Sequence, residues 1–322
     1  MKRAWTLGID LGGTKMLIAL FDRKFKVRAQ EKIRLEANKG EKFFFKALTH
    51  GIEDLVKDAG VKMKQVKAVG VGCAGMIRFP QGIVQYSPNL LFLENYPLRR
   101  KLANVLGRPV YVENDVNAGV IGEHAFGAAA GHSTAVGIFI GTGIGGGIII
   151  DNKIYHGADG AAGEIGHMFV SLDPLWTGNR ETGTLEAYSS RTTLASEAAK
   201  LALRMRAPRL LKNAGTDVRK IKSGALAQSV RTDRAVRELT LQKARILGLG
   251  LANIANILNP SVIVLGGGLI EALGNVIVPE ARRTMEKFGM GPNVKNIEVK
   301  AAKLGDLAVA MGAAKAAWTE FQ

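Results

Sequence analysis

The sequence predicts an α/β protein built from two related halves. Strands alternate with helices along the chain, and a strand–glycine turn–strand unit opens each half. The unit is formed by residues 5–10 and 16–22 in the first half, and by 133–140 and 146–151 in the second. All four segments are apolar, as expected of strands that lie in a core. Their recurrence indicates an internal duplication.

The remaining elements follow from local patterns. Helical periodicity over 41–57 stops at Gly60, and Pro97 suits the first turn of another helix. The other expected strands are 26–35, 66–72, 109–112 and 261–265. The other expected helices are 97–105, 185–205, 233–258 and 306–321.

The composition narrows the class of protein. A chain of 322 residues, 47% of them hydrophobic, can fill two domains or one large one. Its single cysteine, Cys73, excludes an internal disulfide and a zinc site built mainly on thiolates. There is no apolar run long enough to span a membrane, and Asp10 comes too early for a signal peptide. We therefore expect a cytoplasmic protein with no membrane association.

The net charge is +16, and most of it lies in one segment. Residues 200–245 hold thirteen Lys and Arg against three Asp and Glu, and contain no aromatic residue. Bases of a nucleic acid would have nothing to stack on there. We expect a solvated basic face and no specific nucleic-acid partner; a weak site for polyanions is the alternative.

Three glycine clusters stand at strand ends. Glycine lets bare backbone N–H groups approach phosphate oxygens, although one such cluster is usually only a turn. The second cluster also contains G-x-G-x-x-G, but a strand follows it at 147–151 where a dinucleotide fold needs a helix. No P-loop motif occurs, so we expect a hairpin cradle for phosphates. The clusters are Gly12-Gly13-Thr14-Lys15, Gly141 to Gly147 with Thr142 and Gly143, and Gly266-Gly267-Gly268.

Several carboxylates stand next to these strand ends. Asp10 ends the first strand, where it either starts a turn or holds Mg²⁺ beside a phosphate loop. Asp115 follows the strand at 109–112, where it either caps the next helix or takes part in the chemistry. Glu164, His167 and Glu186 share polar loop context after the second hairpin, which favours one shared site.

Together these motifs resemble the ROK family of bacterial sugar kinases, in the actin, sugar kinase and heat-shock ATPase superfamily. The match runs in family order over essentially the whole chain. The motifs are 8–15, 70–75, 87–90, 112–118, 141–147, 162–168, 185–188 and 262–268. The resemblance implies a two-lobed, ribonuclease H-like fold with duplicated βββαβα units and an interdomain cleft. It places the small domain at 1–117, joined by a C-terminal helix at 304–322, and the larger domain at 118–303.

The resemblance also implies roles for single residues. Asp115 corresponds to the general base that faces the sugar 6-hydroxyl. Asp10 corresponds to the residue that helps to place Mg²⁺, directly or through water. The residues expected to hold the sugar are Gly75, Asn89, Asn114, Asp115, Glu164, His167 and Glu186. Those expected to hold ATP are Gly12, Gly13, Thr14, Lys15, Gly141, Thr142 and Gly143 at the phosphates, and Gly267 and Gly268 near the adenosine.

One stretch departs from the family pattern. The family has a cysteine cluster and a zinc ligand at the His of its Gly-His pair, whereas residues 176–186 contain no cysteine. His167 is then the only plausible ligand left, and we expect no zinc. Without the metal, we expect that His167 can bond the sugar directly.

The resemblance implies an enzyme that uses ATP to phosphorylate a hexose, with glucose as the first expectation. N-acetylglucosamine, N-acetylmannosamine and fructose are the alternatives. Some family members are sugar-sensing transcriptional regulators with an added N-terminal helix-turn-helix domain. Here the phosphate motif begins at Leu7, which leaves no room for that domain. A filament or chaperone ATPase would have no use for the polar set around His167. Relatives commonly assemble, so a homodimer or homotetramer is expected.

Overall fold

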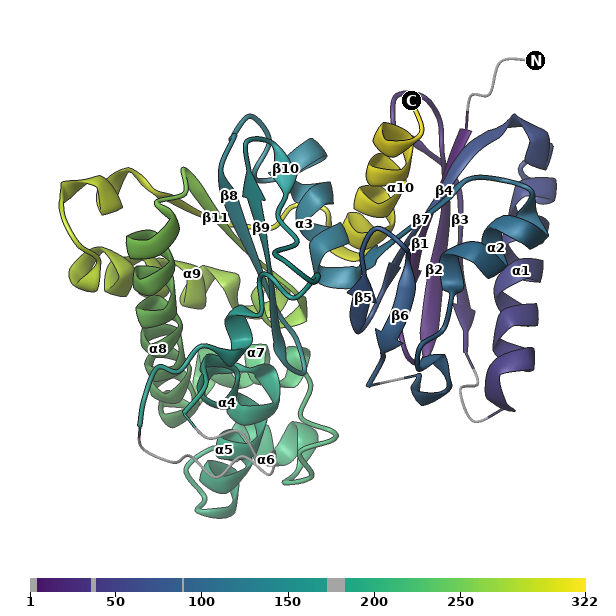
Figure 1. Ribbon diagram of the computed structural model, residues 1–322. Coiled ribbons are helices and arrows are strands. Elements are labelled where there is room, and N and C mark those ends of the chain that lie inside the picture. The colour runs from purple at the N-terminus through teal and green to yellow at the C-terminus, as the bar shows by residue number, and fades with distance from the viewer. Residues whose placement is uncertain (1–4, 36–38, 89, 173–182) are drawn as a thin grey trace. The chain divides into compact units, whose positions relative to one another are not determined.

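The computed structural model describes residues 5–35, 39–88, 90–172 and 183–322, which form two compact units (Figure 1). Unit 1 comprises the described residues up to Gly131, together with Ile148–Ala162 and Asp306–Gln322. Unit 2 comprises His132–Gly147 and Gly163–Gly305.

The sheet of unit 1 has the strand order β3-β2-β1-β4-β7. Its first three strands form an antiparallel meander, and β4 and β7 then run parallel to β1. The bounds are β1 Trp5–Leu11, β2 Lys15–Phe21, β3 Val27–Arg34, β4 Val66–Cys73 and β7 Val110–Asn114. A separate hairpin is formed by β5 Met76–Arg78 and β6 Ile83–Tyr86.

Helices cover both faces of this sheet (Figure 1). On one face, apolar side chains of α1 (Gly40–Asp58) and α2 (Leu98–Leu106) pack with those of β1, β2 and β4. On the other face lie α3 (Asp115–Phe126) and α10 (Ala308–Glu320). Contact with α10 is close: a Cβ on Gly8 would lie 1.9 Å from the Ala310 oxygen. Glycine in β1 therefore lets the C-terminal helix sit directly on the sheet.

The sheet of the second half has the order β10-β9-β8-β11-β12. Its strands are β8 Ala135–Ile140, β9 Ile144–Ile150, β10 Lys153–Ile154, β11 Val262–Gly266 and β12 Glu298–Ala301. Strands β11 and β12 run parallel to β8. The helices are α4 Leu185–Ser189, α5 Arg191–Leu203, α6 Pro208–Ala214, α7 Ser223–Thr232, α8 Arg234–Leu258 and α9 Gly268–Phe288. Apolar faces of α5 to α9 bury one continuous core with β8 and β11.

Both sheets thus have the same order, in which a three-strand meander is followed by two strands parallel to its first. This agreement confirms the duplication that the sequence predicted. The predicted strands and most predicted helices are also confirmed, with ends that differ by two residues or fewer at most positions.

Some elements differ from the expectation. The helix expected over 185–205 is two helices, because Ser190 adopts an extended backbone and its hydroxyl accepts the Thr193 N–H at 3.3 Å. Helices α6, α7 and α9 and the β5–β6 hairpin were not predicted. In α9 the signal was hidden by Gly274 and Pro279, which both interrupt a helical pattern.

The unit boundary differs from the expected division after residue 117. Helix α3 would be cut near its start by that division, but the whole helix stays in unit 1 because it packs along α10. The two backbones touch: a Cβ on Gly312 would lie 1.7 Å from the Ala118 oxygen, and one on Gly122 would lie 2.4 Å from the Ala308 oxygen.

The basic segment, 200–245, runs from the end of α5 to the middle of α8. Part of its charge is paired within unit 2, as in the contacts of Lys243 with Glu197 and of Arg245 with Glu280. Arg204, Arg206 and Arg209 are exposed, in agreement with a solvated face. Among the described residues, no helix is long and apolar enough to cross a membrane.

Candidate active site

Three parallel strands end at one edge of the unit 1 sheet. Gly72 of β4 is paired in register with Asp10 of β1 on one side and with Glu113 of β7 on the other. A Cβ on Gly72 would lie 3.5 Å from the Asp115 Cα, so the start of α3 closes over this edge. The carboxyl ends of parallel strands are where α/β proteins usually bind ligands. The fold therefore brings Asp10 and Asp115 to one place.

Asp10 has an unusual environment for a carboxyl group. Burial, and next the negative charge of Asp115, raise the pKa of Asp10 from 3.8 to about 7. Asp306 adds to the rise, and Lys15 opposes it. Such a site disfavours a second negative charge, and a divalent cation would relieve the repulsion. The environment of Asp10 fits the Mg²⁺ site expected from the sequence.

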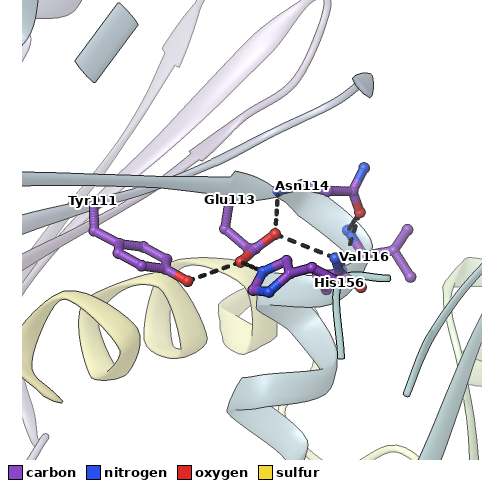
Figure 2. Close-up of polar contacts among 6 residues, drawn as sticks. Tyr111, Glu113, Asn114, Val116 and His156 are labelled. Atoms are coloured by element: carbon purple, nitrogen blue, oxygen red, sulfur yellow. Dashed lines mark hydrogen bonds and ion pairs between the residues drawn. The ribbon is translucent and has the colours of Figure 1, made fainter. Parts of the chain in front are cut away.

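The start of α3 is held by Asn114. The Asn114 Oδ1 atom accepts the N–H groups of Val116 at 2.8 Å and of Asn117 at 3.0 Å, as Figure 2 shows in part. Asn114, and not Asp115, is therefore the N-cap, and Asp115 occupies the first position of the helix. The alternative in which Asp115 serves as the cap is thus wrong. The Nδ2 atom of the same Asn114 side chain donates to the Gly75 carbonyl oxygen at 3.0 Å.

The two glycine sites of unit 1 have different geometry. In the β1–β2 turn, the Gly12 N–H donates to the Lys15 oxygen at 3.1 Å, which places Gly13 and Thr14 at the tip. Gly75 has φ +123°, and a Cβ there would lie 2.1 Å from the Tyr86 oxygen. Only glycine fits this position, which joins β4 to the β5–β6 hairpin.

In unit 2, the glycine turn between β8 and β9 is tied to two helices. The Glu186 Oε2 atom, at the start of α4, accepts the Ile144 N–H at 2.6 Å. Arg191 donates to the Thr142 hydroxyl at 3.0 Å, and its own N–H donates to the Gly141 oxygen at 3.1 Å. A Cβ on Gly143 would lie 2.3 Å from the Glu186 carboxylate. Glu186 therefore holds the turn, a role that sequence reasoning did not give it.

The segment with Glu164 and His167 packs against the start of β9, the strand that follows this glycine turn. A Cβ on Gly166 would lie 2.0 Å from the Ile144 oxygen. His167 and Glu164 are both about half exposed, with 3.8 Å between Nε2 and Oε2. Glu186 bonds to the N–H of Ile144, so this residue at the start of β9 contacts both Glu186 and the segment that carries Glu164 and His167. One polar site shared by the three side chains stays a prediction.

Gly267 and Gly268 lie next to this turn. They follow β11, which is paired with β8 so that Gly266 faces Phe139. Gly267 has φ +86°, and a Cβ there would lie 2.6 Å from the Ile140 oxygen, one residue before Gly141. Gly268 begins α9, whose N-terminal N–H groups and dipole favour negative charge. Unit 2 thus places two glycine clusters and a long helix N-terminus at one sheet edge.

Two expectations involve residues that are not described. Asn89 lies outside the described part of the chain, and so does most of the cysteine-free stretch, 176–182. Among the residues that are described, no group of three or more His, Cys, Asp or Glu side chains could hold a metal ion together. The expected lack of zinc stays a prediction.

Sequence reasoning missed Glu113 and His156. Both are buried or nearly so and hydrogen-bonded to each other directly behind Asn114 (Figure 2). A glutamate inside an otherwise apolar strand was the available signal for Glu113. His156 had no signal, because its partner is 43 residues away in the sequence.

The repeated sheet order, with a glycine turn after the first strand of each sheet, defines an α/β protein of the actin-like ATPase class. The ROK family model matches residues 6–320, and the chain belongs to the ROK family. The expected fold class and family are therefore confirmed.

Known members of this family bear on the function. A glucokinase of Streptomyces coelicolor is 33% identical over 317 residues, 96% of each chain. A xylose repressor of Caldicellulosiruptor bescii is 30% identical over 95% of this chain and 76% of its own length. Among solved structures, a ROK family glucokinase from Streptomyces griseus in complex with glucose and AMPPNP is 31% identical. Its TM-score is 0.82, and the match covers 98% of this chain and 99% of that chain.

Proposed function

We propose that the protein is an ATP-dependent hexose kinase that transfers a phosphoryl group to the 6-hydroxyl of glucose. The observation that carries the proposal is the placement of Asp115 beside Asp10 at the carboxyl edge of the unit 1 sheet. The similarity to glucokinases over nearly the whole chain supports it.

Asp115 is the proposed general base. Phosphoryl transfer passes through a loose transition state, so it needs positioning and charge neutralisation more than a strong base. A carboxylate in the first turn of α3 is held by the helix that Asn114 caps. It can accept the proton of the 6-hydroxyl as the oxygen–phosphorus bond forms.

The residues proposed to hold the sugar come from several segments of the chain. Gly75 and Asn114 are joined by a hydrogen bond of 3.0 Å, and Glu186 bonds to Ile144 at the start of β9. Carboxylate, imidazole and amide groups suit a hexose, because each hydroxyl can both donate and accept. Since the Oε2 atom of Glu186 holds the glycine turn, its Oε1 atom is the one proposed for the sugar. The proposed set is Gly75, Asn89, Asn114, Glu164, His167 and Glu186.

The glycine turns are the proposed phosphate sites. The turn Gly12 to Lys15 in unit 1 and the turn Gly141 to Gly143 in unit 2 both present backbone N–H groups. Gly267 and Gly268 would lie near the adenosine, at the N-terminus of α9. When bound, Mg²⁺ would neutralise phosphate charge, and Asp10 is the residue proposed to place it.

A coupled assay of ADP release tests the reaction. We expect turnover with glucose to exceed that with mannose, fructose, N-acetylglucosamine, N-acetylmannosamine and xylose. A higher specificity constant for another hexose would overturn the assignment to glucose. No turnover with any sugar, combined with thermal stabilisation by a sugar alone, would favour a sugar-sensing regulator like the related xylose repressor.

Asp115→Asn tests the base directly. We expect kcat to fall by roughly 10²- to 10⁴-fold while the protein stays folded and still binds AMPPNP. Asp217→Asn is the matched control, since it makes the same chemical change at a partly exposed residue paired with Arg219. Turnover near the wild-type value in Asp115→Asn would contradict the role of Asp115.

A further inference from the structure

A buried glutamate lies directly behind the proposed base. The side chain of Glu113 is only 2% exposed, in a strand whose other buried residues include Val110 and Val112. Successive side chains of a strand point to opposite faces, so Tyr111 and Glu113 share the face that α3 and α10 cover. A buried carboxylate is costly unless it is fully hydrogen-bonded, so its partners show what it does.

Four groups hydrogen-bond to the Glu113 carboxylate, two at each oxygen, and Figure 2 shows Tyr111, Asn114 and His156 among them. The Oε2 atom accepts the Tyr111 hydroxyl at 2.9 Å and lies 2.7 Å from the His156 Nε2 atom. The Oε1 atom accepts the Asn114 N–H at 3.0 Å and the Asn117 side-chain amide at 3.2 Å. Burial and the Glu113 charge raise the pKa of Tyr111, which keeps its hydroxyl protonated as a donor.

The Oε1 contacts fix the segment that carries Asp115. Asn114 immediately precedes Asp115, and Asn117 lies in the same first turn of α3. Glu113 therefore accepts hydrogen bonds on both sides of Asp115: from the Asn114 backbone N–H before it and from the Asn117 side chain after it. The direction in which the Asp115 carboxylate leaves the helix depends on that backbone.

The Oε2 contacts connect the same segment to a neighbouring loop of unit 1. The His156 ring stacks on Phe79, with 4.0 Å between centroids and 8° between planes. Phe79 follows the β5 strand, and Gly75, just before that strand, accepts the Asn114 side-chain amide. Glu113, His156, Phe79 and the Gly75–Asn114 pair thus form one continuous set of contacts around the start of α3.

We propose that Glu113 is a positioning residue for the phosphoryl transfer: it holds Asn114, and through it Asp115, in the reactive geometry, while His156 and Tyr111 hold Glu113. The proposal rests on the function proposed above. It predicts that loss of the Glu113 contacts slows the chemical step in a protein that is still folded.

Two variants test the two sides of the carboxylate. Glu113→Gln removes the negative charge and leaves a single acceptor oxygen, so the groups on the other side keep a hydrogen bond only if they accept from the new NH2, as the Tyr111 hydroxyl and a neutral His156 can. His156→Leu removes one Oε2 contact and leaves both Oε1 contacts. We expect kcat to fall roughly 10-fold in His156→Leu and between about 10- and 100-fold in Glu113→Gln, because small misplacements of a reacting group are costly. KM for ATP should not change.

Glu123→Gln is the matched control. Glu123 lies in α3, the helix that also carries Asp115, and is 1% exposed. Its carboxylate accepts the Ala128 N–H at 2.7 Å at the C-terminal end of α3. The variant makes the same change to a buried carboxylate, so it can lower the melting temperature, but kcat should stay at the wild-type value. If Glu113→Gln and Glu123→Gln lower kcat equally below their melting temperatures, Glu113 has only a structural role.

A double-mutant cycle with Asp115→Asn separates the two proposals. If Asp115 is the base and Glu113 acts through it, Glu113→Gln should cause no further loss of kcat in the Asp115→Asn background. The same fold-loss in both backgrounds would overturn the positioning role. Wild-type turnover in Asp115→Asn alone would instead overturn the function of Asp115, whatever Glu113→Gln does.

Discussion

Replacement of Asp10 by asparagine should make the stability of the protein respond differently to pH. Burial and the neighbouring Asp115 raise the pKa of Asp10 from 3.8 to about 7 in the folded protein. The folded state then holds this proton more tightly than the unfolded state does. Below about pH 4, Asp10 is protonated in both states and does not change the stability. Its ionisation then destabilises the folded state increasingly as the pH rises, up to about pH 7.

The size of the effect follows from the shift. A change of about three pKa units, at about 1.4 kcal/mol each, gives roughly 4 kcal/mol as an order of magnitude. Asp10→Asn is neutral at every pH, so it escapes this loss. The variant should gain roughly that much stability relative to the wild type between about pH 4 and pH 8.

Urea unfolding of both proteins, followed by circular dichroism with EDTA and without nucleotide, measures the difference at each pH. Asp217→Asn is the control, because hydrogen bonds from Arg219 lower the pKa of Asp217 and any trend should have the opposite sign. A stability difference between Asp10→Asn and wild type that stays flat across this range would refute the account of Asp10.

Four further outcomes concern the packing and the helix capping of the fold. Cys73 is fully buried, and burial, together with the charges of Asp115 and Asp10, raises the pKa of its thiol. Iodoacetamide should therefore label Cys73 only after unfolding, and rapid labelling of the native protein would contradict this. Gly70→Ala should destabilise unit 1 by about 3 kcal/mol in thermal unfolding, since the new Cβ would lie 1.9 Å from the Ala313 oxygen. Gly224→Ala, in an open position of α7, should instead stabilise by about 0.5–1 kcal/mol, and equal effects of the two would be inconsistent with the close packing of α10. Ser190→Ala should cost about 1 kcal/mol through loss of the cap of α5, measured by the same melts, and no cost would argue against that cap.

Much of the candidate site could be predicted from short segments. The glycine turns after β1 and β8, and the carboxylates Asp10 and Asp115, follow strands that are apolar in sequence, so their position at a sheet edge was predictable. The N-cap was not, because Asn114 and Asp115 are both good caps and only the backbone of Asn114 is extended. Similarly, Glu186 was expected at the sugar, and the structure adds its bond to Ile144 in the glycine turn.

The sequence by itself determined the main strands, the longest runs of helix other than α9, the duplication and the family, because apolar periodicity, glycine turns and ordered motifs are local properties of the chain. The tertiary structure decided which groups act on one another. Burial in the folded protein, and next the approach of Asp115, raise the pKa of Asp10, and Glu113 meets His156 only because the segment after β10 folds back against α3. Hydrogen bonds and charges act over a few ångströms in space, whereas these partners are dozens of residues apart along the chain.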